Sequence, residues 1–209
     1  MNIDKLGQIK AIGNLLDYYR SDLIYIHNFQ RFKCGEILLE EYRSKEVPGS
    51  FRRFLNEFRV ARNVKREKVD DFLDFTEKWV RNSPWNDVDA FADELQKSGI
   101  THDGKTMTSL ASKVLFLNNP QVILPCDTRN RAAIGETENR YKNFLEKIED
   151  ILEKETAWIN AALEPVQVYL RTIEREFDEK IADLETIRRN RYLDKLLWVA
   201  GQRGEVIRT

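Results

Sequence analysis

Apolar residues recur at helical spacing along nearly the whole of this 209-residue chain, and this pattern restricts the fold more than any other feature. There are only nine glycines and five prolines, and most fall between the periodic segments. Gly and Pro mark helix ends, so the stretches between them are read as helices. Strand-type alternation is nearly absent, and the apolar run at 121–124 is too short to count. The sequence therefore predicts an all-α protein.

The expected helices cover residues 3–19, 22–42 with a kink near Gly35, 51–61, 69–80, 87–97, 107–117 and 129–134. Ser50 is expected to cap the helix that follows it. Beyond Gly135, two long charged helices at 138–163 and 166–187 are expected to form an antiparallel hairpin split at Pro165, and residues 191–200 to close the fold. This organisation predicts a helical domain over 1–135, with the C-terminal hairpin and closing helix of 136–209 packed on it.

Charge is unevenly distributed, although the net charge is only −1. Residues 52–68 hold seven Lys/Arg against two Glu, residues 136–185 hold fourteen Asp/Glu against seven Lys/Arg, and residues 188–203 hold five Lys/Arg against one Asp. Such opposite local fields allow one face to bind a polyanion, although most charge runs are only the solvated faces of helices. The chain is therefore not basic throughout, but it carries local basic surfaces.

Targeting and metal-binding signals are missing. Cys34 and Cys126 form no CxxC pair, and two histidines are too few for an obvious zinc site. The first residues lack the apolar stretch of a signal peptide, and no apolar run approaches the ~18 residues of a membrane span. We expect a cytoplasmic monomer without metal or cofactor.

Residues 109–134 are the most informative stretch for function. An apolar helical run ends at Asn-Asn-Pro, a short connector follows, and Asp127 then opens a helix that carries Arg129 and Arg131. The N–H groups at a helix start stabilise a carboxylate charge, and arginines hold phosphate. An ordinary helix N-cap is the plain alternative for Asp127.

This stretch resembles the catalytic segment of the helix-hairpin-helix DNA glycosylase superfamily, in which a Val-Asp-Thr-like step supplies the essential aspartate. The corresponding step here is Pro-Cys-Asp-Thr-Arg at 125–129. The resemblance implies that Asp127 stabilises the positive charge that grows on the deoxyribose as the base leaves. It covers residues 1–135 loosely and implies a divergent, bacterial glycosylase-like member without an iron–sulfur cluster.

The same resemblance assigns a nucleophile position on the preceding helix. Bifunctional members carry a lysine there, which forms a Schiff base with the sugar, whereas monofunctional members use water. The family spacing from Asp127 lands on Ser109, eighteen residues earlier, and Lys113 lies one helical turn further on. A serine favours a monofunctional enzyme. Lys113 remains an alternative nucleophile, or it binds phosphate, or it lies in solvent.

The remaining implied contacts are with DNA. The hairpin that normally presents backbone N–H groups to phosphate corresponds to residues 102–108, which hold one glycine, so the side chains of Lys105, Thr106 and Thr108 are expected to take part of that role. Further phosphate contacts are expected from Arg129, Arg131, Arg52 and Arg53. A flipped base needs an aromatic wall, for which Trp85 is preferred over Trp79, Tyr18 and Tyr25.

Two other functions stay open. Arg20 followed by six residues and His27 resembles the active-site motif of HEPN ribonucleases, a short pattern that arises easily by chance. A non-enzymatic module that binds DNA or a partner protein is the third reading. The preferred hypothesis is a DNA glycosylase that acts on duplex DNA with a damaged base, or with a phage-modified base in antiphage defence.

Overall fold

The computed structural model describes residues 1–82, 86–102 and 107–207, and its regular structure in these ranges is helical. Within them no strand forms, and an isolated bridge pairs Val64 with Thr101. The all-α fold class is thus confirmed. The chain divides into two compact units, one built from Met1–Leu23 with Leu124–Thr209 and the other from Ile24–Ile123. The chain therefore passes from one unit to the other after Leu23 and after Ile123, whereas the sequence suggested a boundary between residues 135 and 136.

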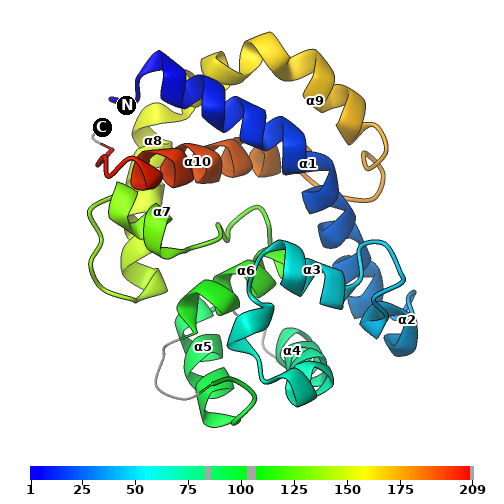
Figure 1. Cartoon of the computed structure of the whole chain (residues 1–209). Helices are drawn as coiled ribbons and strands as arrows, with labels where there is room; N and C mark the ends of the chain where they lie inside the picture. The colour runs from blue at the N-terminus through cyan, green and yellow to red at the C-terminus, as the bar shows by residue number, and fades with distance from the viewer. Residues whose placement is uncertain (83–85, 103–106, 208–209) are drawn as a thin grey trace. The chain divides into compact units, whose positions relative to one another are not determined.

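The first unit joins both ends of the chain. It contains the first part of α1 (Lys5–Lys33), followed by α7 (Thr128–Ala133), α8 (Tyr141–Leu163), a 3-10 turn (Glu164–Val166), α9 (Gln167–Glu174) and α10 (Leu184–Gln202). Helix α10 packs against both α7 and α8 (Figure 1). Most of its apolar side chains are buried, and those of Leu193, Leu196 and Leu197 are completely so, which places α10 in this unit's core.

The second unit holds the last part of α1 and the helices α2 (Leu39–Arg43), α3 (Phe51–Glu57), α4 (Val69–Asn82), α5 (Val88–Lys97) and α6 (Thr108–Asn118). Helices α5 and α6 pack together. Rings from α1, α2, α3 and α4 contact one another in its core: Phe29, Phe32, Tyr42, Phe51, Phe54 and Phe72. Ser50 caps α3 as the sequence predicts, because its hydroxyl accepts a hydrogen bond from the Arg53 N–H.

Two expectations about helix length are wrong. Helix α1 runs without a break across residues 20–22, and it ends before Gly35, whose φ of +77° suits only glycine well. The hairpin of two long helices does not form, because α9 ends at Glu174 and α10 begins at Leu184 rather than at 191. Asp183 starts α10 by accepting a hydrogen bond from the Thr186 N–H. The region expected to form the second arm is therefore divided between α9, a turn and the start of α10.

Gly201 allows the close contact between α10 and α7. A Cβ built on Gly201 would lie 2.1 Å from the carbonyl oxygen of Arg129, which is main chain and cannot rotate away. We expect Gly201→Ala to destabilise the protein by about 3 kcal/mol, because the helices must separate. The matched control is Gly13→Ala on α1, where nothing lies within 4 Å and alanine should stabilise by about 0.5–1 kcal/mol. Chemical denaturation of both variants would measure this, and equal stability of the two would contradict the packing.

Candidate functional site

Asp127 lies at the start of α7, half-buried, and acts as its N-cap. Its Oδ1 accepts hydrogen bonds from the backbone N–H groups of Arg129 at 2.9 Å and of Asn130 at 3.0 Å. In the part of the chain that the structure describes, no hydrogen bond to Oδ2 accompanies these two. The helix start therefore fixes one carboxylate oxygen and leaves the other available to a group outside the fold.

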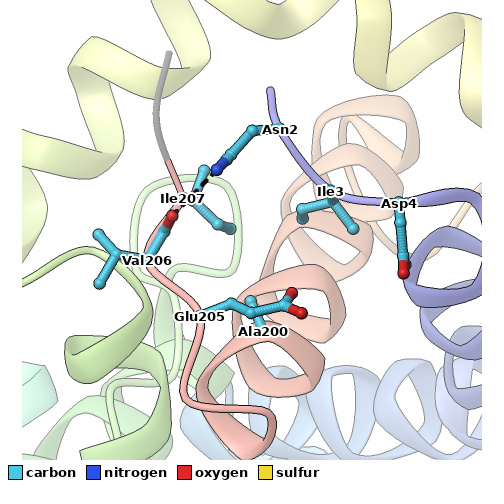
Figure 2. A pocket seen from close by; sticks show the side chains of 7 residues that line it. All are labelled: Asn2, Ile3, Asp4, Ala200, Glu205, Val206 and Ile207. Atoms are coloured by element: carbon cyan, nitrogen blue, oxygen red, sulfur yellow. Dashed lines mark hydrogen bonds between the residues drawn. The ribbon is translucent and has the colours of Figure 1, made fainter.

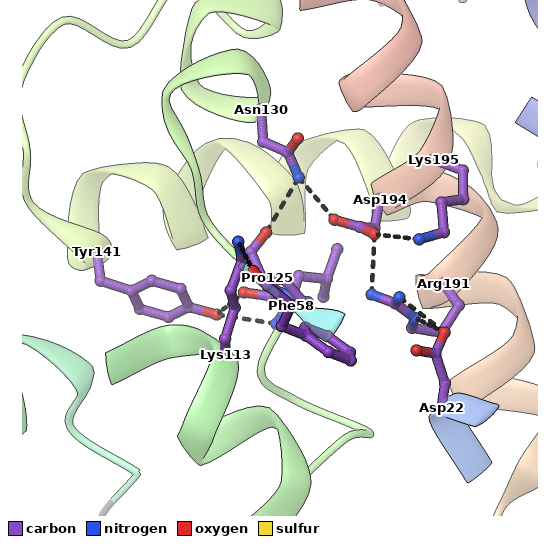
Figure 3. A network of polar contacts seen from close by, with 10 residues as sticks. Asp22, Phe58, Lys113, Pro125, Asn130, Tyr141, Arg191, Asp194 and Lys195 are labelled. Atoms are coloured by element: carbon purple, nitrogen blue, oxygen red, sulfur yellow. Dashed lines mark hydrogen bonds and ion pairs between the residues drawn. The ribbon is translucent and has the colours of Figure 1, made fainter. Parts of the chain in front are cut away.

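Asn130 connects this cap to the interior of the first unit. Its side-chain Nδ2 donates to the carbonyl of Pro125 at 3.0 Å and to Oδ1 of Asp194 at 2.6 Å, as Figure 3 shows. The same residue thus holds the connector before α7, the carboxylate of Asp127 and a side chain of α10. Because Asn130 is buried, these bonds are not exchanged with solvent. They fix the direction in which Asp127 emerges from the connector.

The far side of Asp194 is held by a buried arginine. Arg191 Nη1 donates to Asp194 Oδ2 at 2.8 Å and its Nε donates to Asp22 Oδ2 at 2.8 Å, while its Nη2 forms an ion pair with the same Asp22 oxygen at 2.7 Å (Figure 3). Burial alone would lower the pKa of Arg191, but the carboxylates of Asp22 and Asp194 outweigh it and raise the pKa. The guanidinium is therefore a permanent charge that neutralises two carboxylates inside the core.

A second buried ion pair joins α9 to α10 and α1. Arg188 Nη1 donates to both carboxylate oxygens of Glu174, at 2.9 and 2.7 Å, and the Tyr19 hydroxyl donates to Glu174 at 2.8 Å. Burial and the neighbouring Glu174 raise the pKa of Tyr19 far above its ordinary value. This pair ties the last residue of α9 to α10 and α1.

Two buried tyrosines near these pairs differ in one respect that can be measured. The Tyr192 hydroxyl has no hydrogen-bond partner among the described residues, whereas that of Tyr19 donates to Glu174. We expect Tyr192→Phe to be neutral or to stabilise by about 1 kcal/mol, and Tyr19→Phe to cost about 2 kcal/mol. Denaturant unfolding at neutral pH would compare them, and a larger loss for Tyr192→Phe would contradict the assignment.

Tyr192 also makes the stability of the protein depend on pH. Burial raises the pKa of Tyr192 from 10.0 to about 12, so the unfolded chain ionises before the folded one. Its contribution to stability is complete below pH 10 and is lost as the pH rises through about 12. The Phe variant should therefore lose less stability than the wild type between those values.

Lys195 lies next to Asp194 on α10. Its Nζ is 3.7 Å from Asp194 Oδ2 and 5.3 Å from the ring centroid of Tyr18, and 16% of its side chain is exposed. Burial, and then the guanidinium of Arg191, lower the pKa of the Lys195 ammonium, with Asp194 opposing them. Lys195 is thus an amine with reduced affinity for its proton, close to the residues that hold α7.

The two arginines of α7 differ in their surroundings. Arg129 is exposed, and its guanidinium carbon lies 4.6 Å above the ring of Trp198. Arg131 is half-buried, and its Nη1 donates to the side chain of Asn139. Arg129 therefore presents its charge to solvent beside Asp127, whereas part of the Arg131 charge is occupied within the fold.

The other expected catalytic residues belong to the second unit. Ser109 is half-buried on α6, and its carbonyl accepts a hydrogen bond from the Ser112 hydroxyl. The ammonium of Lys113 donates to the carbonyl of Phe58 at 3.2 Å. Thr108 begins α6 and is completely buried, and the phosphate contact expected of it stays a prediction. Lys105, Thr106 and Trp85 lie outside the described residues.

The basic residues of the expected DNA surface are partly neutralised. Arg52 Nη2 pairs with Asp70 at 2.9 Å, and these two line an open depression of about 410 Å³ together with Arg43. Arg53 is exposed, and its Nε donates to the carbonyl of Lys45 at 2.7 Å. Arg53 is thus the better placed of the two for a phosphate.

The residues of the ribonuclease-like motif both lie on α1. Arg20 is exposed and pairs with Glu176 at 2.8 Å, and His27 is half-buried. The Glu176 carboxylate raises the pKa of Arg20 through this bond. A carboxylate at this position competes with an RNA phosphate for the guanidinium.

A small cavity lies where the first residues of the chain meet the end of α10. Its volume is about 80 Å³, and Asn2 donates to the carbonyl of Val206 across its rim (Figure 2). Ligand pockets measure roughly 300–1,000 Å³, so this cavity is too small for a flipped nucleotide. It is a packing feature of the termini.

Sequence reasoning missed Asn130, Asp194, Arg191, Asp22 and Lys195. A signal was present, because Arg191 and Asp194 are three apart in a segment that is apolar except for these two and Lys195, and Asp22 precedes Leu23 at a position of helical periodicity. Charged residues at core positions indicate a buried pair. However, the sequence around each of these charged residues does not indicate which distant residue is its partner.

Among the described residues, no group of His, Cys, Asp or Glu is arranged to hold a metal ion. Over the same residues, no helix is both long and apolar enough to cross a membrane. Comparison with models of protein families, with curated proteins and with solved structures finds no match to this chain.

Proposed function

We propose that this protein is a DNA N-glycosylase that hydrolyses the bond between a damaged or modified base and its deoxyribose, with Asp127 as the essential carboxylate. The setting of Asp127 carries the proposal, because two N–H groups hold Oδ1 and none of the described donors engages Oδ2. A carboxylate held in this way does not need to reorganise when a positive charge develops near it.

Hydrolysis of the N-glycosidic bond needs few side chains besides Asp127. As the base departs, positive charge spreads over C1′ and the ring oxygen of the sugar, and the carboxylate of Asp127 stabilises it. A water molecule oriented by the same carboxylate then attacks C1′, and the proton that it gives up balances the one that the departing base takes up. Arg129, exposed beside Asp127, is suited to a phosphate that flanks the target nucleotide.

The direct test supplies the purified protein with duplexes that each carry one oxidised, mispaired or bulky modified base. Abasic sites are then developed as strand breaks with heat and alkali. We expect a break at the modified position of at least one duplex and none in the unmodified control. A panel without breaks would contradict the proposal for those bases. RNA cleavage that is lost in His27→Ala would favour the ribonuclease alternative instead.

A further inference from the structure

The two most exposed large apolar side chains in the described ranges are neighbours at the start of α9. Val168 is 77% exposed and Tyr169 is 68% exposed. The hydroxyl of Thr172, one turn further on, donates to the carbonyl of Val168 at 2.8 Å, so this exposed side chain has already used its donor. These residues continue a row of exposed, mostly apolar positions that starts in the last turn of α8 and crosses the 3-10 turn at a spacing of three to four residues. This outer row consists of Ala161, Pro165, Val168, Tyr169 and Thr172.

The opposite face of the same segment packs within the first unit. Leu163 and Leu170, seven residues apart, are buried there. The end of α9 is held through Glu174, which accepts hydrogen bonds from Arg188 and Tyr19. The protomer therefore anchors α9 without using the outer row. An exposed apolar surface beside a complete core indicates a site of interaction with another molecule.

Two opposite charges lie along one edge of the outer row. Glu164 and Arg171 are both exposed, and their separation of seven residues places them on the same side of the helical segment. Among the described residues, neither side chain has an ion-pair partner. When a second copy of the segment crosses the first antiparallel, with the two-fold axis between Pro165 and Val168, Glu164 of each copy lies opposite Arg171 of the other. The same axis places Pro165 opposite Val168.

We propose that the outer row is the interface of a two-fold symmetric homodimer, in which it packs antiparallel against the outer row of a second copy of this chain. The charges identify a second copy as the occupant, because a two-fold interface requires a surface that is complementary to itself. One acid and one base at equal distances from the axis meet this requirement and form two ion pairs at once. The dimer replaces the monomer expected from the sequence, and it does not depend on the proposed function.

The first test measures the mass of the full chain in solution by sedimentation over a concentration series. A single helical row makes a small interface that associates weakly, so the series extends to about 0.5 mM. We expect the wild type to approach twice the protomer mass and Val168→Glu, which places two carboxylates near the axis, to keep the protomer mass. Ile9→Glu is the matched control, because Ile9 is 56% exposed on α1, outside the outer row, and this variant should dimerise like the wild type. A wild type that keeps the protomer mass throughout, or an equal loss in Ile9→Glu, would overturn the proposal.

The second test exchanges the charges. Glu164→Arg leaves two basic residues on the edge and Arg171→Glu leaves two acidic ones, so each variant alone should lose the dimer through like-charge repulsion. An equimolar mixture of the two should recover twice the protomer mass, since every charge then faces its opposite. Both substitutions are at exposed positions, and circular dichroism would verify that the helices are retained. Dimers in each variant alone, or a mixture that stays at the protomer mass while the wild type dimerises, would overturn the antiparallel interface.

Discussion

Asp127→Asn is expected to lower base release by about 10³-fold, the size of effect seen when one electrostatic catalytic group is removed. Asparagine is as good an N-cap as aspartate, so its side-chain oxygen still accepts the two N–H groups that now bond to Oδ1. Stability and duplex binding should therefore be retained, while the negative charge needed beside the sugar is lost. Base release under single turnover, thermal unfolding and duplex affinity would be measured together.

This substitution also separates the two interpretations of Asp127. If Asp127 were only a helix cap, Asn would leave every measurement unchanged. Asp87→Asn is the matched control, because Asp87 caps α5 through the Ala90 N–H in the same manner and has no proposed role in the reaction. Wild-type activity in Asp127→Asn would exclude the catalytic role, and equal losses of activity in both variants would show that the loss is not specific to the charge of Asp127.

Arg191→Met is expected to destabilise the fold by about 3–5 kcal/mol. The guanidinium is 2% exposed and neutralises Asp22 and Asp194, so its removal leaves two buried carboxylates without a cation. Methionine fills much of the volume, and the loss is therefore electrostatic rather than a cavity effect. Denaturant unfolding followed by circular dichroism would measure it.

The origin of that loss can be tested by two further variants. Arg20→Met removes an arginine from the exposed pair with Glu176 and should change stability little, because solvent screens that pair. Adding Asp22→Asn and Asp194→Asn to Arg191→Met removes the buried charges and should restore much of the stability. A triple variant that is less stable than Arg191→Met would show that the lost packing, not the unpaired charge, is the cause.

The starts of α3 and α7 could be predicted from the sequence, because a cap is a local interaction. Ser50 and Asp127 each accept a hydrogen bond from an N–H group two or three residues further along the chain, which a linear pattern can indicate. The setting of Asp127 in the candidate site was also local. The direction that its carboxylate faces was not local. It depends on Asn130, whose side chain is held by Asp194, 64 residues away in the chain.

The sequence by itself determined an all-helical chain, since the spacing of apolar residues and the placement of Gly and Pro act within one segment at a time. Only the tertiary structure decided the partners of the last residue of α9, because Glu174 accepts a hydrogen bond from Tyr19, 155 residues away in the chain. It also decided the surroundings of Lys195, through the pairing of Arg191 with Asp22, 169 residues away. Buried charges choose partners by proximity in the fold, where desolvation makes an unpaired charge costly, and no local pattern encodes that choice.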